Sequence, residues 1–200
     1  MTTAREMGDV RQGILATAQA IMAAKGFSAV GLNEILAAAG VPKGSFYHYF
    51  GSKDAFGEAL LKNYFDNYLT GVDEIFATSS LTFADRLIAY FRQWQENQGA
   101  LDCQGKCLAV KLGAEVADLS EAMRAVLKNG TAGIIGRLTE AIENGIADGS
   151  LTISEDPRSL AETLYHLWLG ASLRAKIVRS TQPFDSAMVA TQRLLDRRSS

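Results

Sequence analysis

Residues 41 to 56 read Val-Pro-Lys-Gly-Ser-Phe-Tyr-His-Tyr-Phe-Gly-Ser-Lys-Asp-Ala-Phe. The segment mixes two kinds of side chain. Apolar ones suited to packing stand at Val41, Phe46 and Phe50. Polar ones able to reach a nucleic-acid backbone or a base edge stand at Lys43, Ser45, Tyr47, His48 and Lys53. Because it directly follows a glycine, the segment predicts a helix with one face in a core and the other presented to a large polyanion.

The composition is that of a globular chain. Its 200 residues are 48% hydrophobic, which suffices for one large domain or for a small head on a larger body. The formal net charge is −2, so the chain as a whole does not attract nucleic acid. Any nucleic-acid binding must therefore come from a local patch.

No apolar run approaches the ~20 residues that a membrane span requires, and the first residues lack the pattern of a secretory signal. We therefore expect a cytoplasmic protein without membrane association. The two cysteines, Cys103 and Cys107, are expected to be free thiols in that reducing compartment. At this spacing within a helix they would also make a poor disulfide.

Helical periodicity runs through every long segment, and no alternating run is long enough to propose a strand. The sequence predicts an all-α protein of about nine helices. Glycine and proline mark the boundaries, with Gly26 and Gly40 at helix ends and Pro42, Pro157 and Pro183 at helix starts. The expected helices span about 10–25, 32–39, 42–50, 53–76, 81–98, 105–115, 120–148, 157–179 and 183–196.

The stretch from Leu32 to Phe50 has the order helix, turn, helix, with Gly40 in the turn. This arrangement offers its second helix to the major groove of DNA. We predict two domains: residues 1–52 form a helix-turn-helix DNA-binding domain, and residues 53–200 form an effector-sensing and dimerisation domain.

The N-terminal part carries a motif that consists of Gly26-Phe27, Leu32 to Ile35, Ala38-Ala39-Gly40-Val41, Lys43 to Phe50 and Ser52-Lys53. This motif resembles the TetR family of transcriptional repressors. The resemblance implies a three-helix head, a larger helical body and a dimer that binds an inverted repeat of double-stranded operator DNA. Gly31 departs from the family, which usually has Thr or Ser capping the second helix, so no phosphate contact from that hydroxyl is expected.

Within this head, the third helix is expected to contact the bases. Lys43 stands at its tip and can donate to guanine O6 and N7, while Gly44 lets the backbone approach closely. Tyr47 offers its ring to a thymine methyl, and for His48, beside it, hydrogen bonding and plain solvent exposure are both open. Phosphate contacts are expected from Arg11, Ser45, Tyr49 and Lys53. A solvated lysine at a helix start is the alternative for Lys53.

The body carries a narrower likeness in Gly105-Lys106-Cys107-Leu108 with Leu112 and Glu115, and in Leu167 to Ala171 with Leu173 and Ala175-Lys176. These residues resemble the TetR branch that represses electrophile-detoxifying reductases of the N-ethylmaleimide reductase type and responds through a cysteine. The resemblance implies that an electrophile or oxidant modifies Cys107.

A reactive Cys107 needs a positive neighbour or a helix N-terminus, because the thiolate is the reacting form. Lys106 and Lys111 are close in sequence, and Lys176 is expected to approach the thiol from a later helix. The alternative for Cys107 is a small buried hydrophobe, and Cys103 is expected to be incidental.

A reversible effector is a second hypothesis. Trp94, Tyr165 and Trp168, with His166, could line an apolar cavity between body helices. At helical spacing the same residues also suit a core. A small apolar ligand in such a pocket is the alternative to covalent sensing.

The last two expected helices resemble the pair that forms the family's dimeric four-helix bundle. Their apolar residues are Leu160, Leu164, Leu167, Ala171, Ile177, Met188, Leu194 and Leu195. We expect a homodimer through these helices. In a preceding helix, Gly130, Gly133 and Gly136 favour close helix packing, with a bendable helix as the alternative.

Other classes of function have weak support. A thiol catalyst would need Cys107, His166 and Asp102 brought together, and no pattern builds an oxyanion hole. A zinc site at the two cysteines lacks correctly spaced partners, since the chain has only two histidines. We expect no enzyme, no metal and no cofactor. An interaction protein with this head but without DNA binding is the remaining alternative.

Overall fold

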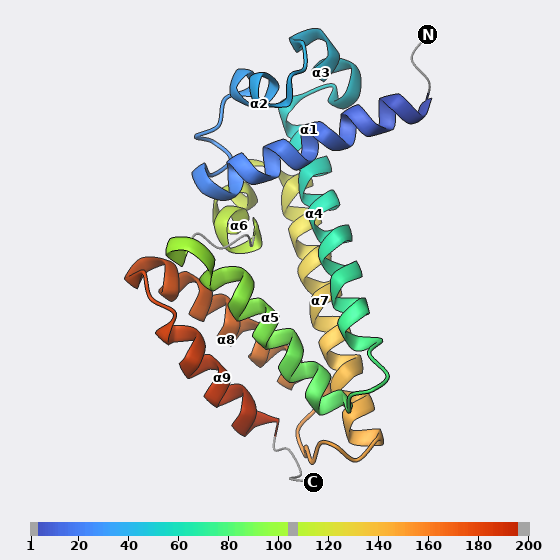
Figure 1. Ribbon diagram of the computed structural model, residues 1–200, viewed down its shortest axis with the longest axis vertical. Helices are drawn as coiled ribbons and strands as arrows, with labels where there is room; N and C mark the ends of the chain where they lie inside the picture. Colours follow the sequence, from blue (N-terminus) through green and yellow to red (C-terminus); the bar gives the residue numbers. More distant parts are fainter. Residues whose placement is uncertain (1–3, 104–107, 196–200) are drawn as a thin grey trace. The chain divides into compact units, whose positions relative to one another are not determined.

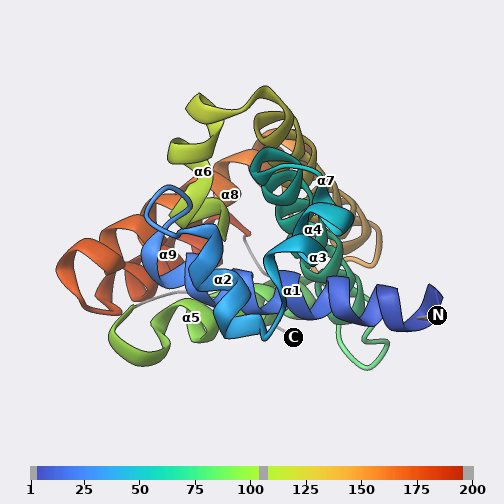
Figure 2. The ribbon, with the colours of Figure 1, turned by 90° about the horizontal axis from the view of Figure 1, so that it is seen from above.

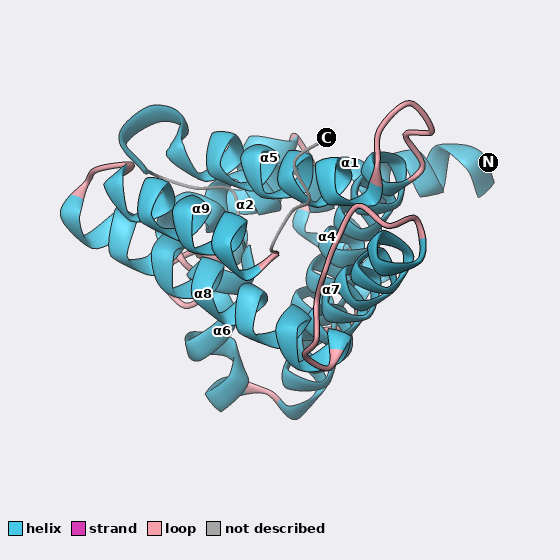
Figure 3. Cartoon of the chain, turned by 90° about the horizontal axis from the view of Figure 1, so that it is seen from below, coloured by secondary structure: helices cyan, strands magenta, loops and turns pink. Residues whose placement is uncertain are grey.

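The computed structural model describes residues 4–103 and 108–195 (Figure 1). These residues form nine α-helices and no strand (Figure 3), which confirms the all-α prediction. The helices are α1 (Ala4–Lys25), α2 (Leu32–Ala39), α3 (Lys43–Phe50), α4 (Lys53–Phe76), α5 (Phe83–Cys103), α6 (Leu108–Leu119), α7 (Glu121–Ala147), α8 (Pro157–Val178) and α9 (Gln182–Leu194). Among the described helices, none is long and apolar enough to cross a membrane.

The short helices begin and end where glycine and proline predict. The chain leaves α2 at Gly40, whose φ of 66° is the left-handed conformation that glycine adopts without strain. The N–H of Val41 then donates to the Leu36 carbonyl at 3.0 Å and closes the helix end. Pro42, in extended backbone, precedes α3. At the start of α4, the Ser52 hydroxyl accepts from the N–H of Ala55 at 3.0 Å, as a capping serine should.

The predicted boundaries of α5 are wrong at both ends, since the helix begins at Phe83 and continues to Cys103. Thr82 explains the start: its hydroxyl accepts from the N–H of Asp85 at 3.2 Å and donates to the Asp85 carboxylate at 2.7 Å. The first bond makes Thr82 the N-cap of α5, and the second orients its hydroxyl.

Two compact units divide the described chain. The first comprises residues 4–66 and 108–130, and the second comprises residues 67–103 and 131–195. Helices α4 and α7 each contribute to both units. The first unit thus joins α6 to the three N-terminal helices. The division of the chain into a DNA-binding domain up to residue 52 and a sensing domain from residue 53 stays a prediction.

The first unit has an aromatic core beneath α3. Phe46 and Phe56 are fully buried, and Phe50 is nearly so. The ring centroids of Phe46 and Phe56 lie 5.2 Å apart, and those of Phe50 and Phe56 lie 5.0 Å apart. Ile14 and Leu15 of α1 are also fully buried. Helix α2 packs against both α1 and α3 (Figure 2).

The core of the second unit is a stack of rings from three helices. Trp168 of α8 lies between Phe91 of α5, at 4.9 Å and 22°, and Phe184 of α9, at 6.0 Å and 23°. The buried indole N–H of Trp168 donates to the Thr191 hydroxyl at 2.8 Å. Helices α8 and α9 lie side by side along this stack (Figure 1).

The glycine series of α7 has more than one explanation. A β-carbon at Gly130 would overlap the ring of Phe65 in α4, and one at Gly133 would come within 3.2 Å of Leu69. Close packing therefore accounts for these two glycines. A β-carbon at Gly136 would meet no atom within 4 Å, so close packing does not explain that position.

Candidate nucleic-acid interface and sensor site

Helix α3 has one anchored face and one free face. Phe46 and Phe50, at i and i+4, are buried against Phe56. Lys43 and Tyr47 also share the i, i+4 spacing, at the edge of this face; Lys43 is exposed, and the side chain of Tyr47 is 50% exposed. Gly44 and His48 are exposed beside them, and Ser45 and Tyr49 are half-buried. The helix is thus fixed by its rings and offers an ammonium and a phenol to solvent.

Arg11 of α1 reaches the same part of the unit. Its guanidinium carbon lies 5.1 Å from the centroid of the Phe50 ring, while the residue stays exposed. A cation over a ring gains about 0.5–1 kcal/mol at an exposed site. This contact orients Arg11 without removing its charge from solvent.

Lys53 lies differently from the other basic residues predicted to contact DNA. Its Nζ donates to the Val30 carbonyl at 3.3 Å and lies 4.9 Å from the centroid of the Phe27 ring. The side chain therefore ties the first turn of α4 to the loop between α1 and α2. That internal role was not part of the sequence prediction. At the start of α2, Gly31 makes no side-chain cap, which agrees with the missing hydroxyl noted in the sequence.

Glu115 of α6 is a structural contact that sequence reasoning missed. Its carboxylate accepts hydrogen bonds from the backbone N–H of Ser28 at 2.6 Å and of Phe27 at 3.1 Å. Partial burial opposes ionisation, but the hydrogen bonds from Ser28 and Phe27 and the charge of Lys111 outweigh it and lower the pKa of Glu115. Since 88 residues separate Glu115 from Phe27, no local pattern could have indicated this pairing.

The predicted sensor thiol, Cys107, lies outside the described residues, as do Gly105 and Lys106. Helix α6 starts at the next residue, Leu108, which is fully buried. Cys103 is the last residue of α5. Lys176 lies half-buried in the last turns of α8, and its approach to Cys107 stays a prediction.

The three aromatic residues predicted to sense an effector fall into different environments. Trp168 belongs to the ring stack of the second unit and is fully buried, and Tyr165 is buried beside Trp94, with 5.7 Å between centroids. Trp94 also lines a cavity of about 190 Å³ between α4 and α5. His166 is exposed.

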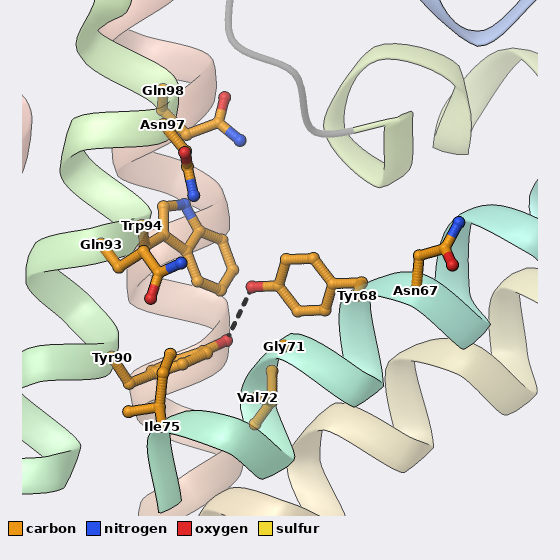
Figure 4. Close-up of a pocket in the computed structure, with 10 residues that line it drawn as sticks. All are labelled: Asn67, Tyr68, Gly71, Val72, Ile75, Tyr90, Gln93, Trp94, Asn97 and Gln98. Atoms are coloured by element: carbon orange, nitrogen blue, oxygen red, sulfur yellow. Dashed lines mark hydrogen bonds between the residues drawn. The ribbon is translucent and has the colours of Figure 1, made fainter. Parts of the chain in front are cut away.

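Aromatic and amide side chains both line the cavity (Figure 4). Tyr68 of α4 points toward Tyr90 and Trp94 of α5, and the two tyrosine hydroxyls lie 3.0 Å apart in a hydrogen bond. Primary amides line the cavity at Asn67, Gln93, Asn97 and Gln98. The remaining lining residues are Gly71, Val72 and Ile75. Of the residues predicted to line an effector pocket, Trp94 is among those that line this cavity, whereas Tyr165 and Trp168 are not among its described lining residues.

The apolar residues predicted for dimerisation divide into two sets. Leu160, Leu164, Ala171 and Leu195 are buried within the chain itself. Of the other predicted residues, Leu167 and Met188 are half-buried, and Ile177 and Leu194 are exposed, Ile177 by 65%. The exposed apolar row of α8 and α9 consists of these two together with Leu173, Val178 and Val189, which were not predicted. This exposed row is the part of the two helices that is available to a partner.

Known proteins with the same architecture define the class of this chain. The pattern described as bacterial regulatory proteins of the tetR family matches residues 14–60, and that of the tetracyclin repressor-like C-terminal domain matches residues 84–191. The chain belongs to the TetR family of bacterial regulatory proteins, as its resemblance implied.

Among curated relatives, the chain is 41% identical to the HTH-type transcriptional repressor NemR of Escherichia coli over 187 residues, which is 94% of each chain. It is 38% identical to the transcriptional regulator AcuR of Cereibacter sphaeroides over 162 residues, 81% of this chain and 74% of that one. The crystal structure of the reduced form of E. coli NemR superposes with a TM-score of 0.90 and 42% identity, and covers 96% of this chain and 100% of that one.

Proposed function

We propose that this protein is a transcriptional repressor that binds an inverted-repeat operator as a homodimer and is released when Cys107 is modified. The observation that supports DNA binding best is helix α3, which is anchored by the buried Phe46 and Phe50 while Lys43 and Tyr47 stay exposed. A helix anchored in this way can enter the major groove without losing its own packing. The names of NemR and AcuR, a repressor and a regulator, support the same class of function and not a class of enzyme.

The contacts to DNA divide by chemistry. Lys43 in the first turn of α3 and Tyr47 one turn later read base edges, with Gly44 allowing close approach and His48 beside them. Arg11, Ser45 and Tyr49 contact phosphates and set the register. Lys53 adds positive charge near the DNA backbone, and its contacts with Val30 and Phe27 also stabilise the fold of this unit.

Two such heads are joined through α8 and α9. The exposed row that includes Leu173, Ile177 and Val189 supplies the apolar surface for a two-fold pairing of these helices. A two-fold dimer matches an operator whose half-sites are inverted. Since the target is bacterial operator DNA, the protein acts in the cytoplasm.

Release begins at Cys107. With an activated alkene, the thiolate attacks the electron-poor carbon, an S–C bond forms, the C=C π bond breaks and the neighbouring carbon takes a proton from water. With a hydroperoxide, the thiolate attacks one oxygen, the O–O bond breaks, and sulfur is oxidised to a sulfenic acid as an alkoxide leaves and is protonated. The similarity to a repressor that was crystallised in a reduced form supports a redox-sensitive thiol.

The covalent change can reach the head through α6. Cys107 directly precedes this helix in sequence, and Glu115, two turns further on, holds the loop between α1 and α2. A shift of α6 would therefore move or break the hydrogen bonds that Glu115 makes with that loop.

Release by a reversible ligand is the second candidate, and the cavity between α4 and α5 favours it. Two measurements separate covalent from reversible release. The intact protein is exposed to N-ethylmaleimide or peroxide and its mass is measured. A mobility-shift assay on the DNA upstream of its own gene then shows whether the treated protein has left the DNA. A mass shift confined to Cys107 together with DNA release supports the covalent route. Release without any mass shift excludes that route.

A further inference from the structure

We propose that Lys25 is a positioning residue for DNA binding, which acts by neutralising Glu34, the one acidic residue of the helix-turn-helix, and touches no phosphate itself. The inference rests on the proposed function, because it concerns the same DNA-binding surface. It adds two residues to those predicted to determine how that surface binds. Both belong to the first compact unit.

Glu34 has an unusual place in the charge pattern of the sequence. It is the only Asp or Glu from Gly26 to Lys53, the range that holds the loop after α1, helix α2, the turn and helix α3. The basic residues of the same range are Lys43 and Lys53. A carboxylate on a surface that approaches a polyanion opposes binding, so this single charge needs a physical reason.

The start of α2 supplies that reason. The first N–H groups of a helix have no partner within it, and a negative charge nearby stabilises them. Gly31, the N-cap of α2, makes no side-chain hydrogen bond, whereas Glu34 lies in the first turn and brings its charge to this end of the helix. Folding of α2 therefore favours the same charge that DNA binding disfavours.

Lys25 resolves this conflict. It lies in the last turn of α1, and Gly26, with a φ of 96°, turns the chain after it. The Lys25 Nζ donates to Glu34 Oε1 at 2.5 Å. The two side chains are 55% and 39% exposed, and an ion pair at such a surface adds little to stability. The pair thus cancels a charge in the field that DNA meets more than it holds the fold together.

The charge lies close enough to DNA to matter. Helix α2 is the first helix of the pair, the one that crosses the DNA backbone in proteins with this motif. It has eight residues and is therefore about 12 Å long. The Debye length at physiological salt is about 8 Å, so a charge anywhere on α2 is at most weakly screened from the nearest phosphates. An unpaired Glu34 would repel these phosphates, whereas the neutral pair does not.

Four variants separate neutralisation from other roles. Lys25→Gln leaves Glu34 unpaired, and Lys25→Arg keeps the pair. The double variant Lys25→Gln/Glu34→Gln removes both charges and keeps their sum at zero. Arg158→Gln is the matched control, because Arg158 pairs with Glu162 at 2.9 Å, the two side chains are 50% and 44% exposed, and the pair belongs to the second unit. It changes the net charge of the chain by the same amount as Lys25→Gln.

The test titrates each variant by fluorescence anisotropy against the DNA upstream of its own gene and against a random duplex, at several salt concentrations. We expect Lys25→Gln to bind both duplexes about tenfold more weakly at about 50 mM salt, with the loss shrinking as salt rises, because each dimer carries two unpaired carboxylates and salt screens them. Lys25→Arg, Arg158→Gln and the double variant should stay within about twofold of the unmodified chain.

Three results would overturn the proposal. A loss in Lys25→Gln no larger than that in Arg158→Gln would show that the pair has no effect on binding. A loss of the same size at every salt concentration would make the role of Lys25 structural only. A double variant as weak as Lys25→Gln, with a salt slope shallower by about one unit, would make Lys25 a phosphate contact in its own right. Each of these leaves the proposed function intact, whereas no DNA binding by the unmodified chain would overturn both.

Discussion

The carboxylate of Glu115 accepts a hydrogen bond from the backbone N–H of Ser28 at 2.6 Å. With the second bond, from the N–H of Phe27, it satisfies two backbone donors in the loop that follows α1. The helix that follows the predicted sensor is thereby attached to the loop that leads into the helix-turn-helix. A single side chain makes this attachment, so it can be tested by substitution.

Glu115→Ala should lower the free energy of unfolding by about 1–2 kcal/mol, because two backbone donors lose a charged acceptor at a partly exposed site. Glu115→Gln, which keeps an acceptor, should lose less of the free energy of unfolding.

The pH dependence of stability supplies a second readout. The pKa of Glu115 is lowered from 4.5, so its stabilising contribution is complete above that pH and is lost as the pH falls through the lowered value. Denaturant unfolding between neutral pH and pH ~3 should show a smaller acid destabilisation in Glu115→Gln than in the unmodified chain. Equal acid destabilisation in the two would contradict this assignment.

Two lysines predicted to contact DNA should differ in their effects. Lys43→Ala should relax the preference for operator over random DNA and leave stability unchanged, because Lys43 is exposed on α3. Lys53→Ala should weaken binding to all sequences, reduce the salt slope by about one unit and cost about 0.5–1 kcal/mol of stability through its contacts with Val30 and Phe27. Fluorescence anisotropy at several salt concentrations and thermal unfolding measure these effects. Lys62→Ala, an exposed residue of α4, is the control.

Two glycines of α7 should respond in opposite directions to the same substitution. Gly130→Ala should destabilise by about 1–3 kcal/mol, because the methyl group would overlap Phe65. Gly136→Ala should stabilise by about 0.5–1 kcal/mol, since its methyl group enters open space and alanine favours the helix. Chemical denaturation measures the free energy of unfolding of both variants. A stable Gly130→Ala variant would show that α4 and α7 are not closely packed there.

The exposed row on α8 should control assembly. Ile177→Lys should give a monomer at micromolar concentration, because a charge replaces an apolar side chain that is 65% exposed in the single chain. Leu119→Lys changes another exposed apolar residue, at the end of α6, and should remain dimeric. Light scattering measures the mass of each. A dimeric Ile177→Lys would place the interface elsewhere.

Local patterns were sufficient to predict much of the fold. Gly40 and Pro42 marked the turn between α2 and α3, and Ser52 marked the start of α4, because each acts on its own neighbours. The alternation of phenylalanines with polar residues in α3 likewise predicted which face is buried.

The remaining features depend on contacts that are distant in sequence. Helical periodicity identifies an inward face but cannot tell whether that face meets a packed core or a cavity. Trp94 and Trp168 therefore looked alike in sequence, although only Trp94 lines the cavity between α4 and α5. The Glu115 contact with the loop after α1 and the Tyr68 contact with Tyr90 were missed for the same reason.

The central claim is that modification of Cys107 releases the repressor from DNA. The most direct measurement is the operator affinity of the unmodified chain and of Cys107→Ser, each titrated by fluorescence anisotropy before and after N-ethylmaleimide, with Cys103 intact in both. The account predicts that treatment lowers the affinity of the unmodified chain by about tenfold or more and leaves Cys107→Ser within about twofold of its untreated value. An equal loss of affinity in Cys107→Ser would contradict it.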